Sequence, residues 1–541
     1  MNRHVALIVI ILSSMIVSAM PARRGGKQVQ QACGQEITVY QHGDEHFHWM
    51  TNERGEWIRR TPEGNYVVIP SLSDNQIIAR RESSPMRISQ LKRMTQRAFP
   101  TNLAKEGLII LVNFKDIKFE TTKAEIDSMY MGLNYTRHYT YDYIFNRRHY
   151  TGEVNSQGSA RQYFYDMSYG QYNPRFHVIG PVTISQNRKY YGENQNDADK
   201  HAEVMIKEAC EEAAKQGVDF SIYDNDHDGE VDFVYILYAG EGEADGGPEE
   251  SIWPHSWGLK DAGVSLKLNG KTINTYACSN EMNSSSGVHD GVATFCHEFS
   301  HVLGLPDIYE TTGNGLWKTS GEWDVMDYGP YNNEGNTPPA YSGYERFFLG
   351  WVTPRVLSDS ENVVLNELNS SKEVLLLTTT GQHNLIGNDP NPTTFWVLEN
   401  RQQKGWDEYV PGHGMLITKI AYSYNKWYDN AVNNSEKNMC VDIIEADGKA
   451  PEYDENNGQN GWFGKLKDAF PSGATSFNGV TGYPINNIRE TDGVITFTVG
   501  DVATDLQAPV GHSSTAHKSI YNGQITILRD GIRYNLLGTR L

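Results

Sequence analysis

The sequence of 541 residues has few cysteines, few basic residues and no long apolar run. Five cysteines are too few for a disulfide framework, and their odd number leaves at least one thiol over. Cys278 and Cys296 could pair, but we favour buried, small apolar side chains for both. A formal charge of −20 and the absence of basic tracts argue against nucleic-acid binding. No run approaches the 18 apolar residues typical of a transmembrane helix.

Motifs of several enzyme classes are also missing. The chain has no GxSxG elbow for a serine nucleophile and no Walker or Rossmann glycine pattern for a nucleotide. Apolar residues nevertheless make up 38% of the chain and aromatic residues 11%, which is enough to build packed cores. We therefore expect a folded protein of two to four domains.

The N-terminal hundred residues predict a signal peptide followed by a prosegment. Residues 1–19 combine Arg3 and His4 with an apolar stretch and small residues before a cleavage site at Ala19. This pattern predicts a secreted or cell-surface protein. Residues 20–100 should form a prosegment, with a small β unit over residues 34–70. The basic stretch that follows, from Arg80-Arg81 to about residue 106, is expected to be exposed and open to proteolysis.

The rest of the chain divides by its hydrophobic patterns. Residues 101–355 alternate buried-type strands with amphipathic helices, which predicts an α+β catalytic domain. Residues 356–502 carry short alternating strands and predict an all-β C-terminal module. Residues 503–541 comprise a polar linker and a short β segment with turns at Asn522-Gly523 and Asp530-Gly531.

The most informative residues run from Cys296 to Asp307 and fit the pattern HExxHxxGxxD. On a helix, positions i and i+4 share a face, so His297 and His301 can direct two imidazoles at one zinc ion. Gly304 permits a sharp turn that lets Asp307 fold back as a third ligand. Glu298 is then placed to accept a proton from the attacking water. The alternative is an ordinary amphipathic helix with two histidines on its polar face.

The identity of the third ligand is open, because Asp, His and Glu all serve there among zinc peptidases. Glu322, Asp327 and Glu345 are the other candidates. A segment about 16 residues after Asp307 supplies Met326 and, two residues later, Tyr328. In a metzincin-like arrangement such a Met lies in a turn beneath the metal, and Tyr328 could steady the oxyanion.

The chain resembles the immune inhibitor A family of secreted zinc metallopeptidases, in the short architecture common in Bacteroidetes-type bacteria. The resemblance covers roughly residues 35 to 500 and lies in Gly158-Ser159, Ser168-Tyr169-Gly170, 252–257, the zinc helix, 323–329, Gly350-Trp351, 399–401, Gly405-Trp406 and 411–414. It implies His297 and His301 as zinc ligands and Glu298 as general base. It also implies a bacterial source, an N-terminal prosegment and a β-rich C-terminal part.

A second metal site is predicted at residues 224–232. The pattern DxDxDG places Asp224, Asp226 and Asp228 around a turn at Gly229, where they offer hard oxygen ligands to Ca²⁺. The carbonyl of Glu230 and the side chain of Asp232 would complete this half of the site. The twelfth position is a tyrosine and a strand follows, so the loop departs from an EF-hand. A solvated acidic turn is the alternative.

Three further features have two interpretations each. His255, between two tryptophans, could shape the substrate cleft, although a hydrogen-bonded structural histidine is favoured. Cys33 could cap the zinc and keep the enzyme latent, although a leftover thiol is favoured. The C-terminal segment resembles those of exported proteins that are recognised by a sorting machinery, or it is a small terminal or adhesive β unit.

The function expected from these patterns is zinc-dependent endopeptidase action on extracellular proteins or peptides. The main alternative is a non-catalytic surface adhesin in which a peptidase fold has become a binding module, and the complete HExxH argues against it. A zinc-dependent hydrolase of other substrates is a third possibility.

Overall fold

The computed structural model of the chain describes residues 20–23, 25–82, 106–132, 135–136, 138–145, 148–194, 199–284, 287, 289–311, 319–449, 452–453, 462–463, 467–500, 517–521, 524–529 and 532–534. The predicted signal peptide, residues 83–105 of the basic stretch and the predicted linker up to residue 516 lie outside the described residues.

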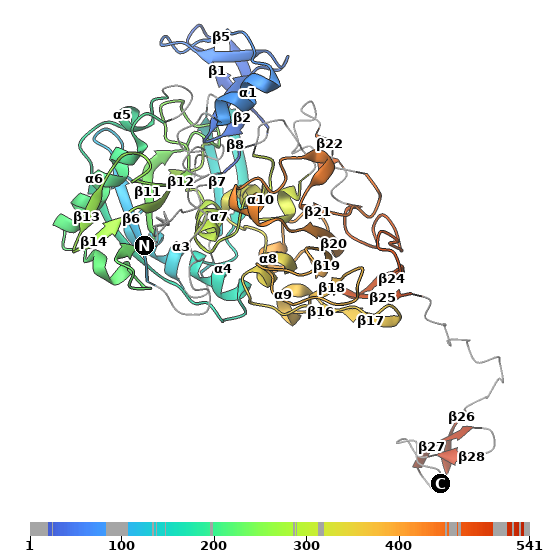
Figure 1. Cartoon of the computed structure of the whole chain (residues 1–541). Coiled ribbons are helices and arrows are strands. Elements are labelled where there is room, and N and C mark those ends of the chain that lie inside the picture. Colours follow the sequence, from blue (N-terminus) through green and yellow to red (C-terminus); the bar gives the residue numbers. More distant parts are fainter. Residues whose placement is uncertain are drawn as a thin grey trace, which may run out of the picture.

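The N-terminal unit is an antiparallel five-stranded meander, found at the top of Figure 1. Its strands are β1 (Gly26–Gln30), β2 (Glu36–Asp44), β3 (Phe47–Thr51), β4 (Trp57–Arg60) and β5 (Tyr66–Val68), followed by the helix α1 (Asp74–Glu82). The strands expected between residues 34 and 70 are therefore present, and β1 adds a further strand before them.

The expectation that Arg81 begins an exposed stretch is wrong. Arg81 is buried, and its guanidinium pairs with the carboxylate of Asp44 and donates to the carbonyl of Thr311. Its neighbour Arg80 is exposed. A pair of basic residues suggested a solvated segment, but the long-range partners of Arg81 hold α1 against the rest of the molecule.

A second five-stranded sheet organises the middle of the chain, in the order β12-β15-β11-β6-β9. Its members are β6 (Glu106–Asn113), β9 (Arg175–Thr183), β11 (Val234–Glu241), β12 (His255–Gly258) and β15 (Thr275–Met282). Pairing is parallel except at the edge, where β12 runs antiparallel to β15. A continuous apolar run such as residues 108–112 suits a strand that is covered on both faces.

Helices cover both faces of this sheet. The helices α3 (Lys123–Met131), α4 (Ala160–Met167) and α7 (Ala293–Val302) pack on the face that carries Ile109 and Leu111. The helices α5 (Arg188–Gly192) and α6 (Ala202–Lys215) pack on the face of Leu108 and Ile110. Helices and strands are mixed as expected, but the mostly parallel sheet between two helical layers is closer to an α/β arrangement than to α+β.

Smaller elements complete the middle of the chain. They are the hairpin β7 (His138–Phe145) and β8 (Arg148–Asn155), the small sheet of β10 (Glu230–Val231), β14 (Lys271–Ile273) and β13 (Leu266–Leu268), the 3-10 turns η1 (Phe220–Tyr223), η2 (Gly321–Trp323) and η3 (Gly329–Gly335), and the helix α8 (Gly343–Phe348).

Two further sheets form the C-terminal unit. One contains β16 (Arg355–Val356), β18 (Leu375–Leu377), β19 (Thr394–Arg401), β20 (Gly414–Ala421) and β21 (Val441–Ile443). The other contains β17 (Glu361–Leu365), β24 (Ile485–Thr491) and β25 (Val494–Val499). Short elements nearby are α9 (Leu368–Ser371), η4 (Gly405–Asp407), α10 (Tyr424–Tyr428), η5 (Glu436–Asn438), β22 (Glu452–Tyr453) and β23 (Trp462–Phe463).

The core is continuous across the predicted boundary at residue 355. On β18, Leu376 joins the core that contains α7, whereas Leu375 and Leu377 face the smaller sheet. The first sheet of the C-terminal unit is thus buried on both faces, between the core that contains α7 and the smaller sheet. The terminal strands β26 (His517–Tyr521), β27 (Gln524–Arg529) and β28 (Ile532–Tyr534) form a separate antiparallel sheet (Figure 1).

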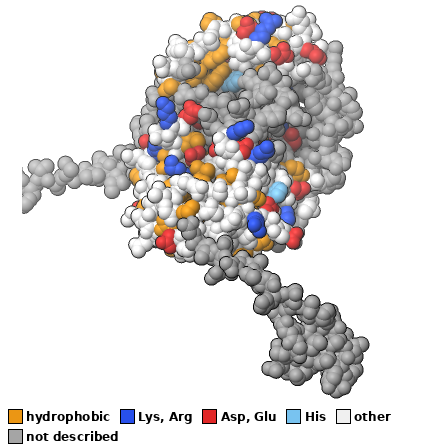
Figure 2. All heavy atoms as spheres, turned by 90° about the vertical axis from the view of Figure 1, so that its right-hand side faces the viewer, with side chains coloured by type: hydrophobic (Ala, Val, Ile, Leu, Met, Phe, Trp, Pro, Cys, Tyr) orange, Lys and Arg blue, Asp and Glu red, His pale blue; other side chains and the backbone are white. Residues whose placement is uncertain are grey.

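The described surface carries both charge signs. On the face shown in Figure 2, which looks onto the right-hand side of Figure 1, Lys and Arg side chains alternate with Asp and Glu. Among the described residues, no helix combines the length and apolar character needed to cross a membrane.

Candidate metal centre

The helix α7 is buried from Ala293 to His301, because its two faces have different partners. Phe295 and Phe299 pack edge-on against Phe176 and join the core beneath the sheet. His297, Glu298 and His301 lie on the other side and are also inaccessible to solvent. Burial of three polar side chains on one helix requires partners or a ligand.

The end of α7 turns the chain back toward these histidines. Gly304 has a φ of +100°, which glycine adopts without a steric penalty. Its N–H donates to the carbonyl of His301, and the N–H of Leu305 donates to that of Ser300, which is the Schellman arrangement. The turn expected at Gly304 is therefore present, and Asp307 follows on the returning chain.

The structure brings His297, His301 and Asp307 together. Nε2 of His297 lies 3.2 Å from Nε2 of His301, and each of these atoms lies 3.4 Å from Oδ1 of Asp307. A tetrahedral zinc site with bonds of about 2.0–2.1 Å has edges of about 3.3–3.4 Å between ligand atoms. The spacing and the two imidazoles plus one carboxylate therefore fit a zinc ion with a further position left for water or substrate.

Backbone carbonyls fix the orientation of both imidazoles. Nδ1 of His297 lies 2.7 Å from the carbonyl oxygen of Val325, and Nδ1 of His301 lies 2.7 Å from that of Leu305. When each Nδ1–H donates to its carbonyl, each Nε2 presents a lone pair to the metal. Val325 belongs to the segment with Met326, so the predicted Met-containing turn supports a ligand directly.

Asn430 is a residue that the sequence analysis missed. Its side-chain N–H donates to Oδ2 of Asp307 at 2.6 Å, and its Oδ1 accepts from the backbone N–H of Asp307 at 2.8 Å. The neighbouring histidines hold the pKa of Asp307 below its usual range although burial opposes this, so the ligand is an anion. Asn430 lies 123 positions further along the chain, and no local pattern points to it.

Glu298 lies beside the cluster with both carboxylate oxygens buried and without a hydrogen bond of normal geometry among the described residues. Burial raises the pKa of Glu298 well above its usual range, the charge of Asp307 adds to this, and the nearby backbone of Met20 opposes it. Tyr328 is half-buried, with its ring 6.5 Å from that of Tyr309. Glu298 is thus prepared to hold a proton.

The other candidates for a third ligand are not part of this cluster. Within the described residues, the group of ligand atoms around the two histidines contains Asp307 but not Glu322, Asp327 or Glu345. Glu345 instead caps α8, where its carboxylate accepts from the backbone N–H of Ser342 at 2.6 Å. The geometry therefore favours Asp307.

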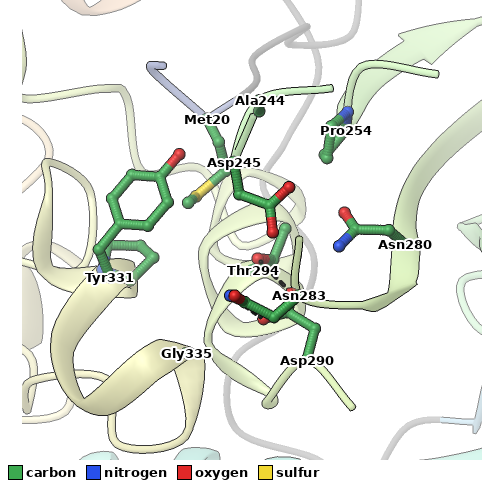
Figure 3. Close-up of a pocket in the computed structure, with 11 residues that line it drawn as sticks. Met20, Ala244, Asp245, Pro254, Asn280, Asn283, Asp290, Thr294, Tyr331 and Gly335 are labelled. Carbon is green, nitrogen blue, oxygen red and sulfur yellow. Dashed lines mark hydrogen bonds between the residues drawn. The ribbon is translucent and has the colours of Figure 1, made fainter. Parts of the chain in front are cut away.

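The N-terminal residues cover the metal centre. The carbonyl of Met20 accepts a hydrogen bond from the indole N–H of Trp253 at 3.1 Å, and its backbone lies close enough to Glu298 to influence the carboxylate. Met20, Pro21 and Ala22 are buried. Figure 3 shows Met20 and Tyr331 on one side of a pocket, with Asp245, Asn280 and Asp290 directed into it.

The turn between β2 and β3 is also buried, near Tyr309. Glu45 and His46 at its tip are 3% and 4% exposed, although such turns normally lie at the surface. Glu45 is one of the charges that influence Tyr309, together with Asp307 and Glu298. Two separate parts of the N-terminal unit therefore reach the region of the metal ligands.

The histidine and the thiols considered from sequence have structural positions. His255 is fully buried, with Nδ1 2.7 Å from the carbonyl of Trp253 and Nε2 3.1 Å from the hydroxyl of Tyr276, and burial lowers its pKa to about 4. Cys278 and Cys296 do not form a disulfide. Cys33 is exposed in the turn after β1, so it is not in a position to cap the buried metal ligands.

The predicted calcium loop is only partly assembled around a common point. Carboxylate oxygens of Asp224, Asp226 and Asp228 lie within 4.8 Å of one another. Asp232 instead accepts from the backbone and side chain of Asn225, at 2.9 and 2.6 Å. One carboxylate oxygen of Glu230 pairs with Lys260.

A lysine contacts the same loop. Nζ of Lys271 lies 2.5 Å from the Asp224 carboxylate, and this hydrogen bond holds the pKa of Asp224 below its usual value although desolvation opposes it. Lys271 therefore offers Asp224 a positive partner that a bound Ca²⁺ would have to displace or tolerate.

If Ca²⁺ binds this loop, millimolar calcium should raise the melting temperature of the protein, because the cation relieves repulsion among three carboxylates. Asp226→Ala should abolish most of that increase. Asp127→Ala, which removes an exposed carboxylate paired with Lys123 on α3, is the matched control and should retain it. Differential scanning calorimetry with and without calcium measures the effect. An unchanged melting temperature would leave the loop as an acidic turn.

Together, the buried helix with two histidines and the adjoining carboxylate form a candidate metal centre beside the central sheet. The comparisons with known proteins agree. Residues 101–352 match the family model described as "Immune inhibitor A peptidase M6, catalytic domain".

Two curated relatives show the extent of the likeness. The chain is 26% identical over 302 residues to "Pre-pro-metalloprotease PrtV" of Vibrio cholerae serotype O1, covering 50% of this chain and 32% of that protein. It is 26% identical over 283 residues to "Immune inhibitor A" of Bacillus thuringiensis subsp. alesti, covering 47% of this chain and 41% of that protein. The matched part thus spans well under half the length of either relative.

Proposed function

We propose that this protein is a secreted, zinc-dependent endopeptidase with a metzincin-like catalytic domain, acting on peptide bonds of extracellular proteins. The observation that carries the proposal is the triangle of His297, His301 and Asp307 ligand atoms beside the buried carboxylate of Glu298. A zinc ion held there supplies a Lewis acid that polarises the scissile carbonyl and the attacking water.

The residues of the chain carry the proton transfers. Glu298 accepts the proton of the attacking water and delivers it to the leaving amine, as general base and then general acid. Among the described residues, neither carboxylate oxygen has a hydrogen bond of normal geometry, so both are available for this exchange. Tyr328 donates its hydroxyl proton toward the oxyanion, and the carbonyls of Val325 and Leu305 keep the imidazoles in one tautomer.

The same proposal includes latency. Residues 20–82 form a prosegment that covers the metal centre through Met20 and the buried turn at Glu45 and His46. The name of the Vibrio cholerae relative, a pre-pro-metalloprotease, is consistent with a zymogen. The signal peptide, the structural Ca²⁺ and recognition of the C-terminal β segment by an export machinery belong to the proposal as well.

Metal removal tests the proposal directly. Protein freed of its prosegment should cleave casein or a mixed peptide library, a zinc chelator should reduce cleavage to background, and added Zn²⁺ should restore it. Mass spectrometry of the products maps the cleaved bonds. Processed protein that contains zinc yet cleaves no peptide would contradict the assignment and favour a binding module.

A further inference from the structure

The first residues of the proposed prosegment lie close to Glu298 and contact the unit that carries the candidate metal centre. The hydroxyl of Tyr331 donates to the carbonyl of Pro21 at 2.6 Å. The backbone N–H of Arg23 donates to the carbonyl of Ala244 at 2.8 Å. Together with the bond from Trp253 to Met20, these contacts engage the backbone of Met20, Pro21 and Arg23, as in the recognition of a peptide by its main chain.

The side chain of Arg23 has a specific partner in the catalytic unit. Its guanidinium donates to both carboxylate oxygens of Glu334, at 2.8 and 2.9 Å, and to Oδ1 of Asn283 at 3.4 Å. It also lies 5.9 Å from the centre of the Tyr331 ring. Both bonds to Glu334 come from Nη2, so the carboxylate and the adjoining aromatic face suit a cationic side chain, Arg or Lys.

The backbone at Asn333 and Glu334 lies in the left-handed region. Asn333 and Glu334 both have positive φ values, +50° and +53°, inside the 3-10 segment η3. Two consecutive residues of this kind without glycine are costly and persist where the surroundings enforce them. The surroundings of Asn333 and Glu334 must therefore hold these two residues in place.

Two further carboxyl groups lie next to this pair. Asp245 and Asp290 line the adjoining pocket, where Figure 3 shows both side chains directed inward. Lys27, also in the N-terminal segment, donates to the carbonyls of Gly246 and Ser284 and attracts Asp245. Removing the prosegment takes Arg23 and Lys27 away, while the carboxylates of Asp245, Asp290 and Glu334 remain.

We propose that the pocket of Glu334, Asn283 and Tyr331 is a substrate subsite for a basic side chain, which Arg23 fills in the uncleaved chain. The proposal rests on the peptidase function proposed above and names its preferred substrate, a peptide with Arg or Lys near the scissile bond. Met20 lies beside Glu298 and Arg23 follows three residues later, so in an extended peptide the basic side chain stands roughly 10 Å from the reacting bond.

Cleavage of a peptide library by the processed protein tests the subsite. Arg, Lys and Gln are placed in turn at each of the four positions on both sides of the scissile bond. We expect kcat/KM to be about 10- to 100-fold higher with Arg than with Gln at the third or fourth position on one side. In Glu334→Gln this ratio should fall to about 3 or less. Glu212→Gln, an exposed carboxylate on α6 across the sheet, should keep it.

A binding measurement separates the subsite from catalysis. The synthetic peptide with the sequence of residues 20–27 is titrated into processed Glu298→Ala protein by calorimetry, beside a peptide with Gln in place of Arg23. Tighter binding of the first peptide, lost in Glu334→Gln, supports the subsite even if no peptide is cleaved, in which case only the peptidase assignment fails. Equal binding of both peptides, or cleavage without a basic preference, would overturn the subsite and leave the peptidase assignment intact.

Discussion

Glu298→Ala is expected to reduce peptidase activity of the processed protein by roughly 10² to 10⁴-fold while leaving zinc in place. The substitution removes the proton acceptor but none of the three ligand atoms that lie 3.2–3.4 Å apart. His301→Ala should abolish activity for a different reason, since it removes a ligand and with it the metal. Zinc content by atomic absorption and kcat/KM on one peptide distinguish the two variants.

The controls for this experiment are straightforward. Glu212→Ala should resemble the wild type in both activity and zinc content, because Glu212 is exposed and pairs with Lys215 on α6. Circular dichroism checks that every variant folds. Near-normal proteolysis by Glu298→Ala would contradict the proposed general base. Loss of zinc from Glu298→Ala would show that the carboxylate helps to hold the metal.

The second large effect is expected on removal of the prosegment. A covering segment held by about 3 kcal/mol leaves roughly 1% of the molecules open, so full-length protein should be about 100-fold less active than processed protein. Limited proteolysis followed by N-terminal sequencing and a peptidase assay measures this. Active material that still begins near residue 20, or equal activity before and after processing, would argue against latency.

Two adjacent arginines offer a matched pair for the same question. Arg81 is buried between Asp44 and the carbonyl of Thr311, whereas Arg80 is exposed. Removing one partner of a buried ion pair typically costs about 3–5 kcal/mol, so Arg81→Ala should loosen the N-terminal unit and raise the activity of the full-length protein at least about tenfold. Arg80→Ala should change it little. Equal effects of the two substitutions would indicate that the contacts of Arg81 do not maintain latency.

Local patterns in the sequence were sufficient for much of the site and the fold. The four-residue spacing of His297 and His301 predicted a shared helix face, and Gly304 predicted the turn that returns Asp307. Alternation of apolar residues predicted the strands of the N-terminal and C-terminal units. These features depend on residues a few positions apart, which is the range over which backbone geometry is fixed by sequence.

The contacts that complete the site join distant residues, and the sequence did not reveal them. Asn430 lies far from Asp307 in the chain, and a polar residue in a loop has many possible partners. The burial of Arg81 depends on its contacts with Asp44 and Thr311, and two adjacent basic residues in the sequence do not indicate such partners. The position of Met20 next to Glu298 likewise depends on how the N-terminal unit packs against the unit that contains α7.

The hydrogen bonds between Asn430 and Asp307 couple zinc affinity to the packing of the β-rich C-terminal unit. Asn430 can restrain Asp307 only when the C-terminal unit is folded and packed against the unit that carries Asp307. If this packing increases zinc affinity, bound zinc must stabilise the packing by the same free energy. The stretch that matches the family model ends at residue 352 and contains all three ligands, yet it lacks the group that orients one of them. If Asp307 is a zinc ligand, a fragment that ends at residue 352 should therefore bind zinc more weakly than the longer chain, because it lacks Asn430.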